Sequence, residues 1–194
     1  LIESTDDVRV ALHDLGGAGP PLLFLHATGF HGRCYQQIAN RLHDRFHVWA
    51  PDLRGHGDTA TPDMALPWVG MADDALAVID HLDPSEPLLA FGHSMGGATV
   101  VAAALRRPGA IRAAWLFEPI IFPLVSQDIP ERETSMSELA RRRRADFDSN
   151  EAAIRNYTGK GPFANVHPDV LRDYVVHGFR PTGQGVTLKT TPEN

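Results

Sequence analysis

The chain has 194 residues, of which 43% are hydrophobic and 22% are charged, and its formal net charge is −6. This length suits one domain with a substantial core, or one domain with a small insertion. The acidic balance argues against a nucleic-acid partner. No apolar run approaches the roughly 18 residues that a membrane helix needs, so we expect no membrane association either.

Cysteine use and the amino-terminal residues bear on the compartment. Cys34 is the single cysteine, so no disulfide can form within the chain, which is consistent with a reducing compartment. We interpret Cys34 as a packed thiol, because no base adjoins it in the sequence. No charged segment followed by an apolar stretch opens the chain, so we expect no signal peptide. The expected location is cytoplasmic, and a homodimer is left open.

The first 118 residues alternate between strand-like and helix-like segments. Short apolar runs predict strands at residues 8–13, 21–26, 46–50, 87–91 and 111–117. Apolar residues at helical spacing predict helices at residues 33–42, 67–82 and 95–107. Strands that alternate with helices favour an α/β fold with a mostly parallel sheet flanked by helices.

The pattern changes after residue 118. Helices are predicted at residues 131–147, 151–157 and 168–176, with no clear strand between them. We therefore predict two parts, an α/β core over residues 1–118 and a helical cap or lid over residues 119–194. Four arginines at 141–144 fall within a predicted helix of an acidic chain. We interpret them as a solvated face of the cap rather than a nucleic-acid site.

The sequence Gly92-His93-Ser94-Met95-Gly96 lies between a predicted strand and a predicted helix. A Gly-x-Ser-x-Gly sequence in this context is typical of a nucleophile elbow, a strained turn that exposes the serine hydroxyl. Glycine on each side relieves crowding by neighbouring backbone. We predict that Ser94 is a catalytic nucleophile and that the amide of Met95, at the helix start, stabilises an oxyanion. The alternative is a turn whose serine caps the helix.

A glycine-containing loop follows the predicted strand at residues 21–26. Such a loop can supply a second oxyanion donor, for which the amide of Thr28 is the candidate. Phe30 and His31, in the same loop, are candidate pocket residues. His26 is a further candidate near the oxyanion site, where it holds the loop through hydrogen bonds. Taken alone, the loop would be interpreted as an ordinary surface connection.

A second loop follows the predicted strand at residues 46–50. Its glycines, together with Asp52 and Arg54, predict a fixed turn with a structural ion pair. We interpret this turn as scaffold rather than chemistry. The sequence shows no Cys/His metal-ligand spacing and no phosphate-binding loop, so we expect no cofactor and no metal.

In this order and spacing the motifs resemble the α/β-hydrolase superfamily, in its serine-nucleophile branch, over roughly residues 8–118. The motifs are the loop after residue 25, an Asp-x-Arg-Gly-x-Gly turn at 52–57 and a Ser-Met-Gly-Gly elbow at 94–97. The resemblance implies an α/β-hydrolase fold with a helical cap, and an oxyanion hole made by the amides of Thr28 and Met95. The chain has His26-Ala27 where the family usually has His-Gly.

A nucleophilic serine needs a general base, and the base needs an orienting acid. The family order is serine, then acid, then histidine. Only His167 and His177 follow Ser94, and both lie in the predicted cap. The family's histidine lies beyond the cap, in a loop after the last strand, so we expect the last core strands and this loop to be missing from the chain.

The other histidines are not expected to be the base. His93 is a candidate pocket residue beside the elbow. The remaining five are interpreted as surface or helix-end residues: His13, His43, His47, His56 and His81.

Glu118 is the candidate acid. It precedes Pro119, which favours an extended backbone at the end of the strand at residues 111–117. Its side chain would then lie at the carboxyl edge of the sheet, near the elbow. The resemblance implies two positions for the acid: some haloalkane dehalogenases place it in a similar stretch, whereas most α/β hydrolases place it after the following strand, which we expect to be missing from the chain. Glu118 is therefore either the triad acid or a charge partner in the pocket, and the alternative is a carboxylate that anchors the cap.

The sequence thus predicts a serine hydrolase that acts on a small ester, lactone or related acyl substrate through an acyl-enzyme. A small-molecule substrate is the expected partner. One alternative is a ligand-binding pseudoenzyme or an incompetent fragment, which the missing histidine motivates. Another is a C–C bond hydrolase or a cofactor-free haloperoxidase or perhydrolase on the same fold. Dehalogenation is disfavoured, because those enzymes have a carboxylate nucleophile where this chain has Ser94.

Overall fold

A computed structural model describes residues 1–59, 68–121 and 143–190 of the chain. Its larger part is a six-stranded sheet with the strand order β1-β2-β4-β3-β5-β6. Strands β3 to β6 pair in parallel, whereas β1 and β2 are antiparallel to their neighbours. The strands are β1 (Ile2–Glu3), β2 (Arg9–Gly16), β3 (Pro21–Leu25), β4 (His47–Asp52), β5 (Leu88–His93) and β6 (Ile111–Phe117).

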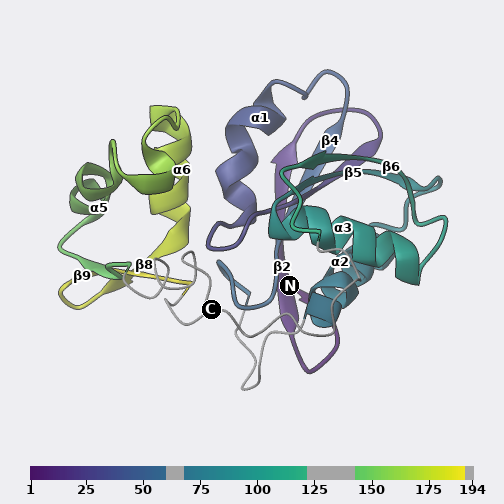
Figure 1. Ribbon diagram of the computed structural model, residues 1–194, viewed down its shortest axis with the longest axis horizontal. Helices are drawn as coiled ribbons and strands as arrows, with labels where there is room; N and C mark the ends of the chain where they lie inside the picture. Colours follow the sequence, from purple (N-terminus) through teal and green to yellow (C-terminus); the bar gives the residue numbers. More distant parts are fainter. Residues whose placement is uncertain (60–67, 122–142, 191–194) are drawn as a thin grey trace.

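Helices cover both faces of this sheet because its central strands are apolar on both faces. In β3, Leu23 and Leu25 belong to a buried cluster with α2 (Trp68–Leu82) and α3 (Met95–Arg106). The alternate residues, Leu22 and Phe24, belong to a second cluster with η1 (Gly32–Tyr35) and α1 (Gln36–Asn40). Figure 1 shows α2 and α3 on one side of the sheet and α1 on the other. The predicted α/β fold is therefore confirmed.

Residues 143–190, here called the cap segment, add helices and a second sheet. The helices are α5 (Asn150–Tyr157), η2 (Gly161–Phe163) and α6 (Pro168–Gly178), so two predicted cap helices are present. The sheet has three antiparallel strands, β7 (Asp146–Phe147), β8 (Phe179–Thr182) and β9 (Gly185–Leu188), in the order β7-β9-β8. In Figure 1 the cap segment lies beside the larger sheet.

The second sheet is not predicted by the sequence pattern. The helix expected through residue 147 is not present at its end, where Asp146 and Phe147 pair with Thr187 and Val186 of β9. Strands of two to four residues are too short to show the period-two alternation by which a strand is recognised. The rest of that predicted helix, before residue 143, lies outside the described residues. We propose residue 118 as the boundary between the core and the cap.

The cap segment is packed on the core through α6 and η1. Tyr174 and Val175 of α6 share the second buried cluster with Cys34 and Tyr35 of η1. Cys34 is 4% exposed, and burial raises the pKa of its thiol. The interpretation of Cys34 as a packed thiol is thus confirmed.

The outer strand β6 exposes apolar side chains. Among the described residues it pairs with β5 alone. Trp115 is 73% exposed and Phe117 is 50% exposed. An apolar, unpaired strand edge of this kind is unusual for an isolated sheet.

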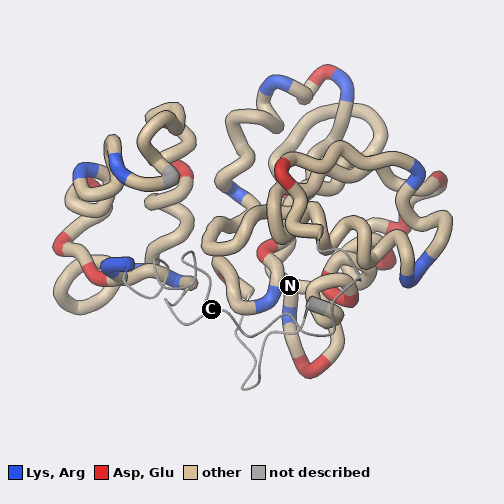
Figure 2. The backbone as a smooth tube through the Cα atoms, viewed as in Figure 1, with Lys and Arg blue, Asp and Glu red and all other residues tan. Residues whose placement is uncertain are grey.

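Charged residues of both signs are intermixed along the described backbone. Figure 2 shows Lys and Arg alternating with Asp and Glu over both the larger sheet and the cap segment. Among the described residues, the helices lack the combination of length and apolar character required to cross a bilayer.

Candidate active site

Ser94 occupies a strained turn between β5 and α3. Its φ is 52° and its ψ is −114°, in a region that non-glycine residues rarely adopt. A Cβ atom on Gly92 would lie 2.6 Å from the Cα of Gly97, and one on Gly96 would lie 2.7 Å from the carbonyl oxygen of His26. Both glycines are therefore required by close backbone approach. The turn has the geometry of a nucleophile elbow, and the side chain of Ser94 does not cap the helix.

Two backbone amides near Ser94 can serve as oxyanion donors. Met95 is the first residue of α3, where backbone N–H groups lack helical acceptors. Within the described parts of the chain, neither the amide of Met95 nor that of Thr28 donates a hydrogen bond. The helix dipole adds a partial positive charge at Met95. These amides are suited to stabilise a developing negative charge.

The loop that contains Thr28 lies against the elbow. β3 pairs in parallel with β5, with Leu25 opposite Gly92, so the loop begins at the same sheet edge as Ser94. His26 holds this loop from inside. Its Nε2 accepts a hydrogen bond from the amide of Leu53 at 2.9 Å, and its Nδ1 lies 2.9 Å from the carbonyl oxygen of Ala27. Complete burial lowers the pKa of His26 to about 3, so the ring is neutral.

Tyr35, which the sequence analysis did not single out, connects the loop to the elbow. Its hydroxyl accepts a hydrogen bond from the amide of Ala27 at 3.2 Å and lies 2.9 Å from Nδ1 of His93. Because the hydroxyl accepts from Ala27, its own hydrogen is available to His93. His93 directly precedes Ser94, so one buried phenol positions both the oxyanion loop and the residue before the nucleophile. No sequence motif marks a tyrosine for this role.

Phe30 and His31 extend from the same loop to the cap segment. The ring of Phe30 lies 6.3 Å from that of His93 and 5.5 Å from that of Tyr174 in α6. Phe30 thus lies next to the elbow and next to the cap. His31 is buried against α6, where its Nε2 is 3.1 Å from the carbonyl oxygen of Tyr174. Burial lowers the pKa of His31 to about 4.

Glu118 lies in a turn that is bonded to the elbow on both sides. The amide of Ser94 donates a hydrogen bond to the carbonyl oxygen of Phe117 at 2.9 Å. The amide of Ile120 donates one to the carbonyl oxygen of Ser94 at 3.2 Å. Glu118 itself is exposed and lies beyond β6, with a φ of 46°, so the expectation of an extended backbone there is wrong. This φ is a strained value for a residue with a side chain. Partial burial lowers the pKa of His93, and the carboxylate of Glu118 opposes this effect. A carboxylate therefore lies near the elbow at the carboxyl edge of the sheet.

None of the ten histidines, all of which lie in the described ranges, forms a hydrogen bond with Ser94. His167 is exposed and accepts a bond from the amide of Asp169, at the start of α6. The pKa of His177 is lowered, mainly by burial. The nearby charge of Arg33 lowers it further, and that of Asp173 raises it.

Two histidines that were interpreted as surface or helix-end residues are buried, so that interpretation is wrong for them. His13 is 8% exposed and bonds to Asp52 at 2.9 Å. His56 is 2% exposed, its Nδ1 is 3.0 Å from the carbonyl oxygen of Arg54, and its ring packs on that of His26. Their polar partners lie on other elements or in the same turn, where sequence spacing does not reveal them.

The turn at residues 52–57 is scaffold, but its ion pairs differ from the predicted one. Asp52 does not pair with Arg54. Burial alone would raise the pKa of Asp52, but the hydrogen bond and charge of His13 hold it well below its usual range. Arg54 is fully buried and forms an ion pair with Asp74 of α2 at 2.9 Å and with Asp6 at 2.7 Å.

Three side chains of this region have a geometry that could hold a cation. Oxygen and nitrogen atoms of His13, Asp52 and Asp58 lie within 4.8 Å of one another. Each of these groups already has a protein partner. Asp52 accepts from His13 and from the amide of Asp58, and Asp58 forms an ion pair with Lys189. The cluster is thus a hydrogen-bonded connection between the core and the cap segment.

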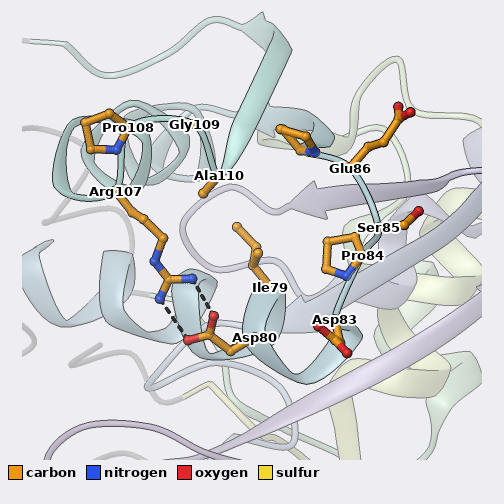
Figure 3. Close-up of a pocket in the computed structure, with 11 residues that line it drawn as sticks. Ile79, Asp80, Asp83, Pro84, Ser85, Glu86, Arg107, Pro108, Gly109 and Ala110 are labelled. Atoms are coloured by element: carbon orange, nitrogen blue, oxygen red, sulfur yellow. Dashed lines mark hydrogen bonds and ion pairs between the residues drawn. The ribbon is translucent and has the colours of Figure 1, made fainter.

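A surface pocket of about 470 Å³ lies at the opposite edge of the sheet from Ser94. Its lining includes Pro87 and Ala110, which precede β5 and β6, whereas Ser94 follows β5. Figure 3 shows that Asp80 and Arg107 form an ion pair beside it. Pockets that hold substrate in open α/β sheets lie at the carboxyl ends of the strands, so this pocket is not part of the candidate active site.

Comparison with known proteins agrees with this geometry. Residues 22–188 match the family model described as the alpha/beta hydrolase family. The chain therefore belongs to the alpha/beta hydrolase family.

Several characterised proteins are similar to the chain. The 2-(acetamidomethylene)succinate hydrolase of Mesorhizobium japonicum is 29% identical over 172 residues, which are 88% of this chain and 58% of that protein. A lipase of Mycobacterium tuberculosis is 34% identical over 108 residues, or 55% of this chain and 40% of the lipase. The chain thus spans less than two thirds of the length of these relatives.

Solved structures show the same fold. The crystal structure of E-2-(acetamidomethylene)succinate hydrolase superimposes with a TM-score of 0.78 at 23% identity, covering 100% of this chain and 69% of that one. A thermophilic esterase from Thermogutta terrifontis, with malate bound, superimposes with a TM-score of 0.68 at 26% identity. The match covers 99% of this chain and 67% of the esterase chain.

Proposed function

We propose that the protein is a serine hydrolase that cleaves a small ester, lactone or related acyl compound through an acyl-enzyme. The observation that carries this proposal is the strained turn of Ser94, placed between β5 and the amino terminus of α3. In this reaction the hydroxyl of Ser94 attacks the acyl carbon. The amides of Met95 and Thr28 then donate to the oxyanion, and the leaving group departs as the acyl-enzyme forms.

Glu118 is the proposed acid. It is held beside the elbow by backbone bonds on both sides, which fits a carboxylate that orients a base and stabilises its charged form. None of the histidines of this chain, all of which lie in the described ranges, bonds to Ser94. We therefore assign the general base to a histidine outside these 194 residues.

The similar proteins support the reaction class, which is hydrolysis. They include a hydrolase of a substituted succinate, a lipase, and an esterase solved with malate bound. The proposed function takes from them the reaction class alone, because the chain covers only part of each relative.

Labelling with a fluorophosphonate probe tests the proposal without knowledge of the substrate. We expect one adduct, mapped by mass spectrometry to Ser94. The adduct should be lost in Ser94→Ala and retained in Ser85→Ala, which removes a serine at the opposite edge of the sheet. A site that lacks one triad member still accelerates reaction by about 10³-fold over water, so slow labelling is expected. Added imidazole should accelerate it by acting as the base.

Two results would contradict the proposal. Labelling that persists in Ser94→Ala would place the reactive group elsewhere. A complete absence of labelling, even with imidazole, would favour the ligand-binding alternative.

A further inference from the structure

Arg143 is turned inward, against the expectation for the four-arginine run. It begins the cap segment and is half-buried, whereas Arg144 beside it is exposed. Nη1 of Arg143 is 3.3 Å from the hydroxyl of Tyr174 and 3.5 Å from the carbonyl oxygen of Gly29. The interpretation as a solvated face is therefore wrong for Arg143. Arg141 and Arg142 lie outside the described residues.

The guanidinium of Arg143 lies directly against the oxyanion loop. A Cβ atom on Gly29 would come within 2.9 Å of its Nη1, which shows how closely the guanidinium approaches the loop. Gly29 adjoins Thr28, the candidate oxyanion donor. Tyr174, which contacts Arg143, also contacts Phe30, and Phe30 in turn contacts His93 beside Ser94.

Among the residues that the structure describes, Arg143 has few partners for its charge. Its Nε is buried without a hydrogen-bond partner, and its hydrogen bonds to described residues are long and go to neutral oxygens. Within the described parts of the chain, Arg143 forms no ion pair with a carboxylate. An arginine carries five donors in a planar fork that matches a carboxylate. Leaving such a charge partly desolvated and unpaired is costly for the folded protein.

We propose that Arg143 binds a carboxylate of the substrate, so that the acyl compound cleaved at Ser94 is an anion. This inference rests on the proposed function and narrows its substrate class. One end of the substrate pairs with the guanidinium, and its acyl group reaches the amides of Thr28 and Met95. The cap segment thereby selects the substrate by charge, while the core performs the chemistry.

Succinate is a suitable probe, because one carboxylate can pair with Arg143 while the other stands in for the acyl group. We would measure its dissociation constant by titration calorimetry, with neutral succinamide as the comparison ligand. Arg143→Gln should weaken succinate binding about tenfold or more, since a hydrogen-bonded charge is lost. Arg144→Gln makes the same change of charge at an exposed neighbour and should alter binding by about twofold or less.

Arg143→Lys keeps the positive charge but lacks the planar guanidinium. Its affinity for succinate should lie between those of the unmodified protein and Arg143→Gln. This variant also shows that loss of binding in Arg143→Gln does not reflect misfolding. Succinate should further slow fluorophosphonate labelling of Ser94 in the unmodified protein and in Arg144→Gln, but not in Arg143→Gln. That protection places the carboxylate site next to the nucleophile.

The outcomes separate this inference from the proposed function. If Ser94 is labelled but succinate binds no better than succinamide, or both glutamine variants weaken it equally, the inference fails and the hydrolase stands. If succinate binds through Arg143 but Ser94 is never labelled, the anion site stands and the hydrolase fails.

Discussion

Close backbone packing around Ser94 decides which residues its turn can contain. We expect Gly96→Ala to lower the free energy of unfolding by about 1–3 kcal/mol, because the added Cβ would overlap the carbonyl groups of Leu25 and His26. Gly183→Ala adds the same atom in open space and should have little effect. Urea unfolding of both variants measures the difference. Equal stability of the two variants would contradict the elbow geometry.

The phenol of Tyr35 gives a second prediction at this scale. Tyr35→Phe leaves the buried amide of Ala27 without its acceptor, which should cost about 1–3 kcal/mol of stability. If Tyr35 positions the oxyanion loop, labelling of Ser94 should also slow by about tenfold or more. Tyr157→Phe removes a hydroxyl that bonds to Arg144 in the cap segment and is the matched control. A rate loss of the same size in both variants would mean that the hydroxyl of Tyr35 has no special role.

The residues of the candidate site were predictable to different degrees. Ser94 and its glycines form a local motif, because the turn is made by consecutive residues. Tyr35 and Arg143 were not found, since each acts through contacts between distant segments. Tyr35 contacts His93 across 58 positions of sequence, and Arg143 contacts Gly29 across 114.

At the scale of elements, the buried ion pair between Arg54 and Asp74 fixes the turn after β4 to α2. Both side chains are fully buried. Asp74→Asn should therefore lower the free energy of unfolding by about 3–5 kcal/mol, because the buried guanidinium of Arg54 loses the negative charge of its buried partner. Asp80, on the same helix, pairs with Arg107 but is 62% exposed, so Asp80→Asn should cost less than about 1 kcal/mol. Chemical denaturation of both variants tests the contrast, and a small loss in Asp74→Asn would refute it.

Elements of the core were more predictable than those of the cap segment. The predicted core strands and helices are present within three residues of their expected ends, although the helix at 33–42 is divided into η1 and α1. Their apolar runs and helical spacing arise from burial on both faces of one sheet. The strands β7, β8 and β9 are short and partly exposed, so their residues carry little of that pattern.

For the whole molecule, buried neutral histidines make stability depend on pH. His26 and His31 have folded-state pKa values of about 3 and about 4, against 6.5 when unperturbed. Between pH 6.5 and pH 4 the unfolded state therefore binds more protons than the folded state. The free energy of unfolding should fall by up to about 1.4 kcal/mol per pH unit for each histidine as the pH decreases, and the slope from these two residues should fade above pH 6.5 as the unfolded imidazoles become neutral.

Urea unfolding at a series of pH values measures this slope. His31→Asn should lower the number of protons taken up on unfolding by about one and reduce the slope accordingly, since it removes one of the two histidines. A stability that stays level between pH 6.5 and pH 4 would show that these rings are not held neutral by burial.

The position of Cys34 has a practical consequence. The single thiol of the chain lies in η1, beneath the residues of α6 that attach the cap segment. A thiol reagent can reach it only when these two elements separate, and burial keeps the sulfur in its unreactive protonated form until then. The rate of alkylation therefore records how often the cap segment lifts from the core. Ligands that contact both the cap segment and the core should slow the alkylation of Cys34. The alkylation rate therefore reports ligand binding between the two parts without an added label.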